Sequence, residues 1–120
     1  MQDPVTEEMD MEFQEKICVV TGAGGNIGRH ICLHFVRGGA KAVAVIDCNS
    51  ETAENTASEL RALGCEAEAF VCDLKSYDAV HEAFEKIIAK WGRVDILSTA
   101  AGGSTRQYMT TLAKQRQAGI

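Results

Sequence analysis

Apolar residues recur along the chain with two alternating periods, one typical of buried strands and one typical of amphipathic helices. Short apolar runs rich in β-branched residues occupy residues 16–20, 42–47, 66–72 and 94–100. Runs of this length, bounded by polar or turn-forming residues, predict strands inside a sheet. We therefore expect four strands, which read KICVV, AVAVID, EAEAFVC and VDILSTA.

The stretches between these strands follow the helical period, with apolar residues three or four positions apart. Asn49 or Ser50 is expected to cap the second helix, and the third is expected to run from about Ser76 to Trp91. Glycines close all three helices. The expected apolar stripes are Ile27, Ile31 and Phe35 in the first helix, Ala53, Ala57 and Leu60 in the second, and Val80, Phe84, Ile87, Ile88 and Trp91 in the third.

Strict alternation of strands and helices, with short connections, predicts a parallel sheet with helices on its faces and right-handed crossovers. The expected fold class is α/β: a three-layer, Rossmann-like, doubly wound sheet, here a partial one with the order β-α-β-α-β-α-β. In such sheets, ligands bind beyond the carboxyl ends of the strands, where the strand order reverses. A cluster of glycines follows the first expected strand and therefore lies at that edge.

Composition is that of an ordinary globular domain, with 120 residues of which 46% are hydrophobic and 24% charged. No apolar run approaches the roughly 18 residues needed to cross a bilayer, and the N-terminus lacks the pattern of a secretory signal. No membrane partner is expected. The sequence divides into residues 1–15, an acidic tail, residues 16–102, which contain the alternating strands and helices, and residues 103–120, to which no structure is assigned.

Charge is unevenly distributed along the chain. The net formal charge is −5, but residues 1–15 alone carry −6 because they contain no lysine or arginine. The rest is nearly neutral, which gives no indication of a nucleic-acid partner. We interpret the acidic stretch as a solvated extension or as the result of an alternative start before Met11.

Five cysteines occur, and none forms a Cys-x-x-Cys pair. An odd number without such pairs predicts neither a disulfide framework nor a zinc site. We expect reduced, mostly buried thiols in a cytoplasmic protein, and we expect no metal.

The glycine cluster TGAGGNIG, residues 21–28, has the composition of a phosphate-binding loop. A helix N-terminus offers unpaired N–H groups and a partial positive charge to a diphosphate, provided that no side chains intervene. Gly22, Gly24, Gly25 and Gly28 meet this condition, and Asn26 tolerates left-handed geometry better than other non-glycine residues. A P-loop is excluded because it requires Gly-Lys-Ser/Thr, whereas Arg29 follows Gly28.

Asp47 ends the second expected strand, 19 residues after Gly28. At an offset of about 20 residues, a carboxylate can accept hydrogen bonds from the adenosine ribose and repel a 2′-phosphate. Because no basic residue lies within the loop or directly after Asp47, NAD is expected rather than NADP. The alternative is that Asp47 merely caps the next helix.

The loop, the strand end VID, the pair Asp73-Leu74 and the stretch GRVDILSTAAG together resemble the short-chain dehydrogenase/reductase family, over about residues 16 to 102. The second helix and third strand look like its classical branch, of which this chain would be the N-terminal half. The spacing of Gly22, Gly25 and Gly28 also fits the extended branch, which includes sugar-nucleotide epimerases.

The resemblance implies a role for several positions. Asp73 matches the residue whose carboxylate meets the adenine amino group, and Leu74 provides the adjacent backbone contact. Ile27 matches the residue beside the pyrophosphate, and Asn26 replaces the middle glycine of the family loop. The remaining positions that match the cofactor-binding pattern are Thr21, Gly22 and Gly28 in the loop, and Ala101 and Gly102 after the fourth strand.

The chain also departs from the family pattern. Thr99-Ala100 replaces the Asn-Asn pair that normally precedes Ala-Gly, and no Tyr-x-x-x-Lys pair is present. In the family, that tyrosine acts as acid and base while the lysine lowers its pKa. Tyr108 is followed four residues later by Leu112, and the nearest lysine is Lys114, a spacing that does not place both on one helical face. No catalytic residue is therefore assigned.

Two functions of different classes follow. The first is an NAD-dependent oxidoreductase of the short-chain type, which acts on a small alcohol or carbonyl substrate and is represented here by its dinucleotide-binding half. The second is a truncated, inactive chain that binds nucleotides or a partner protein. In a sheet of this topology a fifth strand normally flanks the fourth; without it, VDILSTA would form an exposed apolar edge, from which we expect poor solubility or self-association.

Overall fold

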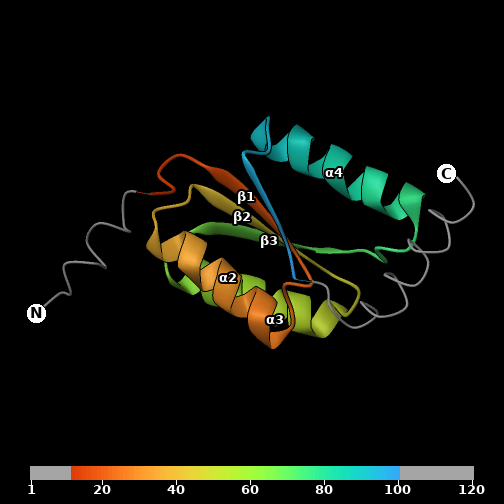
Figure 1. Ribbon diagram of the computed structural model, residues 1–120, viewed down its shortest axis with the longest axis horizontal. Coiled ribbons are helices and arrows are strands. Elements are labelled where there is room, and N and C mark those ends of the chain that lie inside the picture. The colour runs from red at the N-terminus through yellow and green to blue at the C-terminus, as the bar shows by residue number, and fades with distance from the viewer. Residues whose placement is uncertain (1–11, 101–120) are drawn as a thin grey trace, which may run out of the picture.

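The computed structural model describes residues 12–100, which form an alternating α/β structure (Figure 1). The expected order of four strands and three helices is confirmed. The elements are β1 (Ile17–Thr21), α2 (Asn26–Arg37), β2 (Ala42–Asp47), α3 (Ser50–Ala62), β3 (Glu66–Val71), α4 (Tyr77–Trp91) and β4 (Ile96–Thr99).

All four strands are parallel, and their order in the sheet is β3-β2-β1-β4. In the central strand β1, Val19 lies opposite Ala44 of β2 on one side and Leu97 of β4 on the other. The chain moves outward from β1 to β3 and then crosses back to place β4 beside β1. The order thus reverses between β1 and β4, which is the partial doubly wound topology expected from the sequence.

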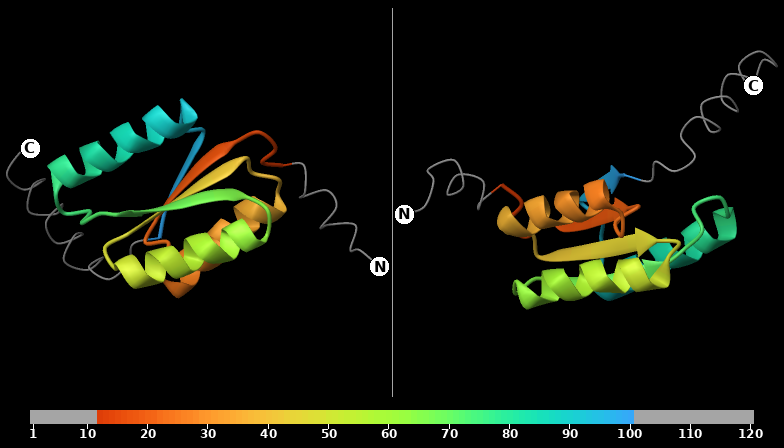
Figure 2. Two further views of the ribbon diagram at one scale, coloured as in Figure 1. Left: turned by 180° about the vertical axis from the view of Figure 1, so that it is seen from behind. Right: turned by 90° about the horizontal axis from the view of Figure 1, so that it is seen from below.

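Helices cover both faces of this sheet, α2 and α3 on one side and α4 on the other (Figures 1 and 2). Because successive strand residues point to opposite faces, Cys18 and Val20 pack with α2 and α3, while Val19 packs with α4. All three side chains are fully buried. A strand covered on both faces must be apolar throughout, which explains why the first run in the sequence is continuous rather than alternating.

The helix ends follow the polar signals in the sequence. The Asn49 side chain caps α3 by accepting a hydrogen bond from the Thr52 N–H at 3.1 Å. The Ser76 hydroxyl caps α4 in the same way, accepting from the Ala79 N–H at 3.2 Å. Gly92 ends α4 with φ of 84°, a left-handed conformation that glycine adopts without steric cost. Of the two expected caps for α3, Asn49 is therefore the one used.

Two of the three expected apolar stripes need correction. In α3, Ala53, Ala57 and Leu60 are all fully buried, as expected. In α2, by contrast, Ile27 is 71% exposed, because it lies in the first turn, at the carboxyl edge of the sheet. In α4, Ile88 is 45% exposed, whereas Ala83 is buried in its place.

The expected strand limits also need small corrections. The fourth strand is Ile96–Thr99 rather than residues 94–100, and just before it the Asp95 side chain accepts a hydrogen bond from the Ile17 N–H. The third strand ends at Val71 rather than Cys72, and the first extends to Thr21.

The thiols follow the expectation with one exception. Cys18, Cys32 and Cys72 are buried and Cys65 is half-buried, but Cys48 is exposed; all five are free. Burial raises the pKa of the Cys18 and Cys32 thiols to about 12, so these side chains stay protonated near neutral pH. Among residues 12–100, no helix has the length and apolar character required to span a membrane.

Candidate functional site

The glycine loop lies at the carboxyl end of β1 and leads directly into α2. Gly22 makes the turn with φ of 70°, and Gly25 donates a hydrogen bond to the Gly22 carbonyl at 3.2 Å. Gly28 packs against the turn so closely that an added Cβ would lie 2.2 Å from the Gly22 carbonyl oxygen. The loop is therefore folded back on itself, and a side chain at Gly28 is excluded by backbone atoms.

The start of α2 is open to solvent. Gly25 occupies the N-cap position in an extended conformation, no side chain among residues 12–100 caps the helix, and the first turn contains no acidic residue. Gly25, Asn26 and Ile27 are all exposed. A helix start without a protein acceptor retains its N–H donors and its partial positive charge for an anion. The expected diphosphate site depends on these donors.

Asp47, at the end of β2, lies against this loop. Its Oδ2 accepts a hydrogen bond from the Gly24 N–H at 2.9 Å, and its Oδ1 accepts one from the Asn49 N–H at 3.1 Å. The sequence left open whether Asp47 merely caps the following helix. It does not, because the capping side chain of α3 is that of Asn49. Asp47 and the glycine loop are thus in direct contact, although they lie more than 20 residues apart in the sequence.

Arg29, the first basic residue after the loop, extends towards α3. Its Nε and Nη2 donate to the two carboxylate oxygens of Glu59 at 2.7 and 2.6 Å. These bonds raise the pKa of Arg29 and lower that of Glu59. Two parallel hydrogen bonds fix the orientation of a guanidinium group. Arg29 therefore links α2 to α3.

Asp73 and Leu74 follow β3 and lie at the same edge of the sheet. The Cys72 N–H donates to the Asp47 carbonyl at 3.0 Å, which joins this segment to the end of β2. The Asp73 Oδ1 accepts a hydrogen bond from the Lys75 N–H at 2.9 Å, and Leu74 is 39% exposed. Both side chains are accessible, as a contact with an adenine ring would require.

Thr21, the last residue of β1, is the remaining described member of the expected set. Its side chain is 5% exposed, and within residues 12–100 its hydroxyl has no hydrogen-bond partner. Its carbonyl accepts the Ala100 N–H at 2.8 Å, which holds the end of β4 beside the loop. Ala101 and Gly102, together with Tyr108 and Lys114, lie outside the described residues.

Comparison with known proteins matches this architecture to one family. Residues 16–118 match the family described as short chain dehydrogenase. The 7alpha-hydroxysteroid dehydrogenase of Escherichia coli (strain K12) is 34% identical over 110 residues, which are 91% of this chain and 43% of that protein. The chain belongs to the short chain dehydrogenase family.

Solved structures of dehydrogenases superpose on this chain. A hydroxysteroid dehydrogenase from Escherichia coli gives a TM-score of 0.74 at 35% identity, covering 81% of this chain and 41% of that one. An NAD+-bound xylitol dehydrogenase gives a TM-score of 0.69 at 38% identity, and the match covers 72% of this chain and 33% of that one. The 120-residue chain therefore spans less than half the length of these relatives.

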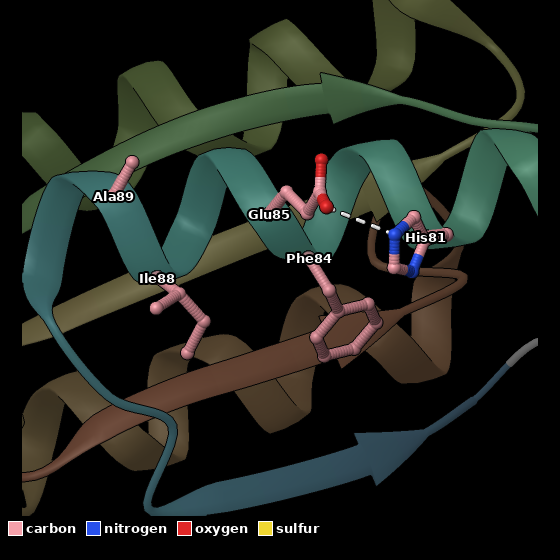
Figure 3. Close-up of a pocket in the computed structure, with 5 residues that line it drawn as sticks. All are labelled: His81, Phe84, Glu85, Ile88 and Ala89. Carbon is pink, nitrogen blue, oxygen red and sulfur yellow. Dashed lines mark ion pairs between the residues drawn. The ribbon is translucent and has the colours of Figure 1, made fainter.

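A second surface feature, a hollow on α4, lies apart from the glycine loop. His81, Phe84, Glu85, Ile88 and Ala89 line a shallow hollow on α4 (Figure 3). Its polar members pair with each other, His81 Nε2 lying 2.9 Å from Glu85 Oε1 one helical turn away. Phe84 and Ile88 point towards β1 and β4 in the close-up (Figure 3). The hollow is apolar and contains no cluster of reactive groups.

Sequence reasoning missed two residues that shape the loop. Thr52 lies beside Gly24, such that a Cβ on Gly24 would be 2.4 Å from the Thr52 Oγ1. Glu59 holds Arg29 away from the loop. A threonine three residues after a helix cap, and a glutamate on the exposed part of a helix, carry no signal in the sequence that distinguishes them from solvated residues. Only the packing of α3 against α2 identifies them.

Proposed function

We propose that this chain is the dinucleotide-binding part of an oxidoreductase that transfers hydride between a nicotinamide dinucleotide and an alcohol or carbonyl substrate. The observation that carries the proposal is the uncapped N-terminus of α2, held against the carboxylate of Asp47 through Gly24. The first-turn N–H groups would bind the diphosphate, and Asp47 would accept the hydroxyls of the adenosine ribose. Asp73 and Leu74 would contact the adenine, with Ala101 and Gly102 completing the cofactor pocket.

The relatives support this assignment of chemistry. Their names describe dehydrogenases of hydroxysteroids and of D-threitol, and their structures include complexes with NAD+, NADH and NADP. When bound, a nicotinamide cofactor would supply the hydride acceptor or donor. The residues of this chain would bind and orient its adenosine diphosphate half.

We propose NAD rather than NADP as the cofactor, on electrostatic grounds. A 2′-phosphate would lie next to the Asp47 carboxylate, a like charge that raises the free energy of binding. Arg29, the first basic residue after the loop, is already paired with Glu59 in two hydrogen bonds. Glu51, in the first turn of α3, adds a further negative charge. The loop itself, residues 21–28, contains no basic side chain that could compensate a 2′-phosphate.

Titration of the purified chain with NAD and NADP tests both parts of this proposal. We expect NAD to bind at least about tenfold more tightly, which corresponds to about 1.4 kcal/mol. Calorimetry or tryptophan fluorescence would report the dissociation constants, and Asp47→Ser should reduce the ratio between them. Equal affinities would contradict the preference for NAD, and binding of neither nucleotide would contradict the site itself.

The 120 residues taken alone support a second proposal, which is nucleotide binding without turnover. It is favoured by one observation, the absence of a Tyr-x-x-x-Lys pair from the sequence. Hydride transfer in this family needs that acid and base, so we expect the chain by itself to bind NAD but not to oxidise or reduce a substrate.

We further propose that the chain associates with a second copy along β4. This strand lies at one edge of the sheet, and within residues 12–100 it pairs only with β1. It carries no charged residue, whereas the opposite edge strand β3 contains Glu66 and Glu68. Charged side chains protect an edge against pairing with another chain, and an uncharged edge lacks that protection. Leu97 of β4 is 54% exposed.

We also propose a cytoplasmic location. The support is chemical: all five cysteines are free, and burial keeps the thiols of Cys18 and Cys32 protonated. Such a set of unpaired cysteines is typical of a reducing compartment.

A further inference from the structure

The Asp47 carboxylate connects two backbone segments that come from different parts of the chain. Its Oδ2 accepts a hydrogen bond from the Gly24 N–H, in the loop after β1, at 2.9 Å. Its Oδ1 accepts one from the N–H of Asn49, the cap of α3, at 3.1 Å. One side chain thus joins the glycine loop to the start of α3.

The glycine loop also packs closely against the start of α3. An added Cβ on Gly24 would lie 2.4 Å from the Thr52 Oγ1 and 3.0 Å from the Asp47 Oδ2. Thr52 is itself held by the helix cap, since its N–H donates to the Asn49 Oδ1 at 3.1 Å and its hydroxyl to the Asn49 carbonyl at 3.3 Å. The loop therefore rests against a surface whose own side chains are fixed by local hydrogen bonds.

We propose that Asp47 is a positioning residue for the glycine loop, in addition to any contact that it makes with the ribose of a cofactor. Its two backbone hydrogen bonds hold the loop, and with it the exposed N–H groups of the first turn of α2, in place before a nucleotide binds. The inference rests on the proposed function in one respect, namely that the loop binds a nucleotide. The hydrogen bonds that position the loop lie within the chain itself.

The two roles are compatible because a carboxylate has room for both. Ionised, it offers about four lone-pair positions, two on each oxygen. The Gly24 and Asn49 N–H groups occupy one position on each oxygen. One position per oxygen remains, which matches the two neighbouring hydroxyls of an adenosine ribose. An amide in the same place has a single acceptor oxygen and turns its NH2 group towards one of the two backbone donors.

A nucleotide analogue separates positioning from ribose binding. We compare NAD with a dinucleotide whose adenosine ribose lacks both hydroxyls, for the wild-type chain and for Asp47→Asn. If Asp47 only binds the ribose, the substitution weakens binding of NAD and leaves that of the analogue unchanged. Positioning of the loop predicts that the affinity for the analogue also falls, by about tenfold for the loss of a charge-assisted hydrogen bond.

Glu51→Gln is the matched control, since it removes one negative charge from an exposed side chain in the first turn of α3, four residues after Asp47. It should change both affinities by no more than about twofold. An affinity for the analogue that is the same in wild type and Asp47→Asn would overturn the positioning role.

Amide hydrogen exchange in the free chain provides a test that needs no nucleotide. In Asp47→Asn, we expect the Gly24 amide to exchange about tenfold faster, while the amides of Val43 and Val45 in β2 keep their wild-type rates. Faster exchange in a chain that binds no dinucleotide would support positioning and contradict the proposed function. Unchanged exchange at Gly24 in a chain that binds NAD would overturn positioning alone.

A second variant tests the proposal even if Asp47→Asn does not fold correctly. Gly24→Ala keeps the carboxylate but places a methyl group against the Thr52 hydroxyl. We expect weaker binding of the analogue, and partial recovery when Thr52→Ala is added to make room. Wild-type affinity for the analogue in Gly24→Ala would show that the loop need not lie against α3, and the proposal would fail.

Discussion

At the level of single residues, the glycines of the loop differ in what they contribute. Gly28 lies where an added Cβ would be 2.2 Å from the Gly22 carbonyl oxygen and 2.8 Å from the Ala23 Cα, both backbone atoms. Gly25, by contrast, leaves 3.4 Å to the same oxygen and has φ of −78°, which any residue can adopt. Glycine is thus required at position 28 because backbone atoms leave no room for a side chain. At position 25 a side chain would fit, and the lack of one leaves the N–H groups at the start of α2 accessible to a ligand.

This difference leads to a prediction for two alanine variants. Gly28→Ala should lower the free energy of unfolding by roughly 1–3 kcal/mol, the cost of overpacking against atoms that cannot move aside, and should reduce NAD binding. Gly25→Ala should lower it by less than 1 kcal/mol, which is about the difference between glycine and alanine as a helix cap. Urea denaturation of both variants measures these values, and equal losses would contradict the distinction.

At the level of elements, Asp95 connects β1 and β4 before their ladder begins. Its carboxylate accepts a hydrogen bond from the Ile17 N–H at 2.8 Å, and its own N–H donates to the Ile17 carbonyl at 2.9 Å. The bond to Ile17 lowers the pKa of Asp95 below its usual value, and the nearby Arg93 lowers it further. A lowered pKa means that the folded state favours the ionised carboxylate more than the unfolded state does.

The stability of the chain should therefore depend on this group in acid. The contribution of Asp95 is present above the pKa of an unfolded aspartate, about 3.9, and is lost as the pH falls through the lower pKa of the folded state. Asp95→Asn should be destabilising at pH 7, with a difference from wild type that shrinks towards pH 2. Denaturation across this range tests it, with the exposed Glu12→Gln as control. A difference that is independent of pH would contradict the assignment.

At the level of the whole molecule, the two edges of the sheet are unequal. At the β3 edge, Glu68 pairs with Lys90 at 2.6 Å, and Glu66 accepts a hydrogen bond from the Trp91 indole at 2.8 Å. The β4 strand carries no charged residue. Leu97 of β4 lies opposite Val19 in the ladder, and Val19 packs on the α4 side of the sheet, so Leu97 points to that side as well. The apolar hollow of α4 lies on this same side. The uncharged edge and this apolar surface favour association with a second copy.

Sedimentation velocity of the full chain over a range of concentrations would detect this association. We expect an oligomer that dissociates on dilution, and we expect Leu97→Lys to shift it to monomer, because edge lysines oppose strand pairing. Val71→Lys is the control, since Val71 is a comparably exposed residue (58%) on the other edge strand. Loss of association in Val71→Lys alone would place the interface at β3, and a monomer at all concentrations would contradict the proposal.

Much of the fold could be predicted from sequence because its determinants are local. Strand runs, helical stripes, the caps Asn49 and Ser76, and the terminating Gly92 all depend on residues within a few positions of one another. The expected stripe failed at Ile27, where the helix extends past the sheet and leaves an apolar residue exposed. Periodicity indicates which side of a helix is apolar, but it contains no information on where the neighbouring sheet ends.

The sequence by itself determined the order of strands and helices, the glycine-rich turn into α2 and the presence of a carboxylate at the end of β2. Only the tertiary structure decided what these parts contact: the Gly24 bond to Asp47, the commitment of Arg29 to Glu59, and the place of β4 beside β1. The physical reason is range. Backbone preference and periodicity act over one or two turns, whereas these contacts join segments more than 20 residues apart, whose meeting depends on how the helices pack across the sheet.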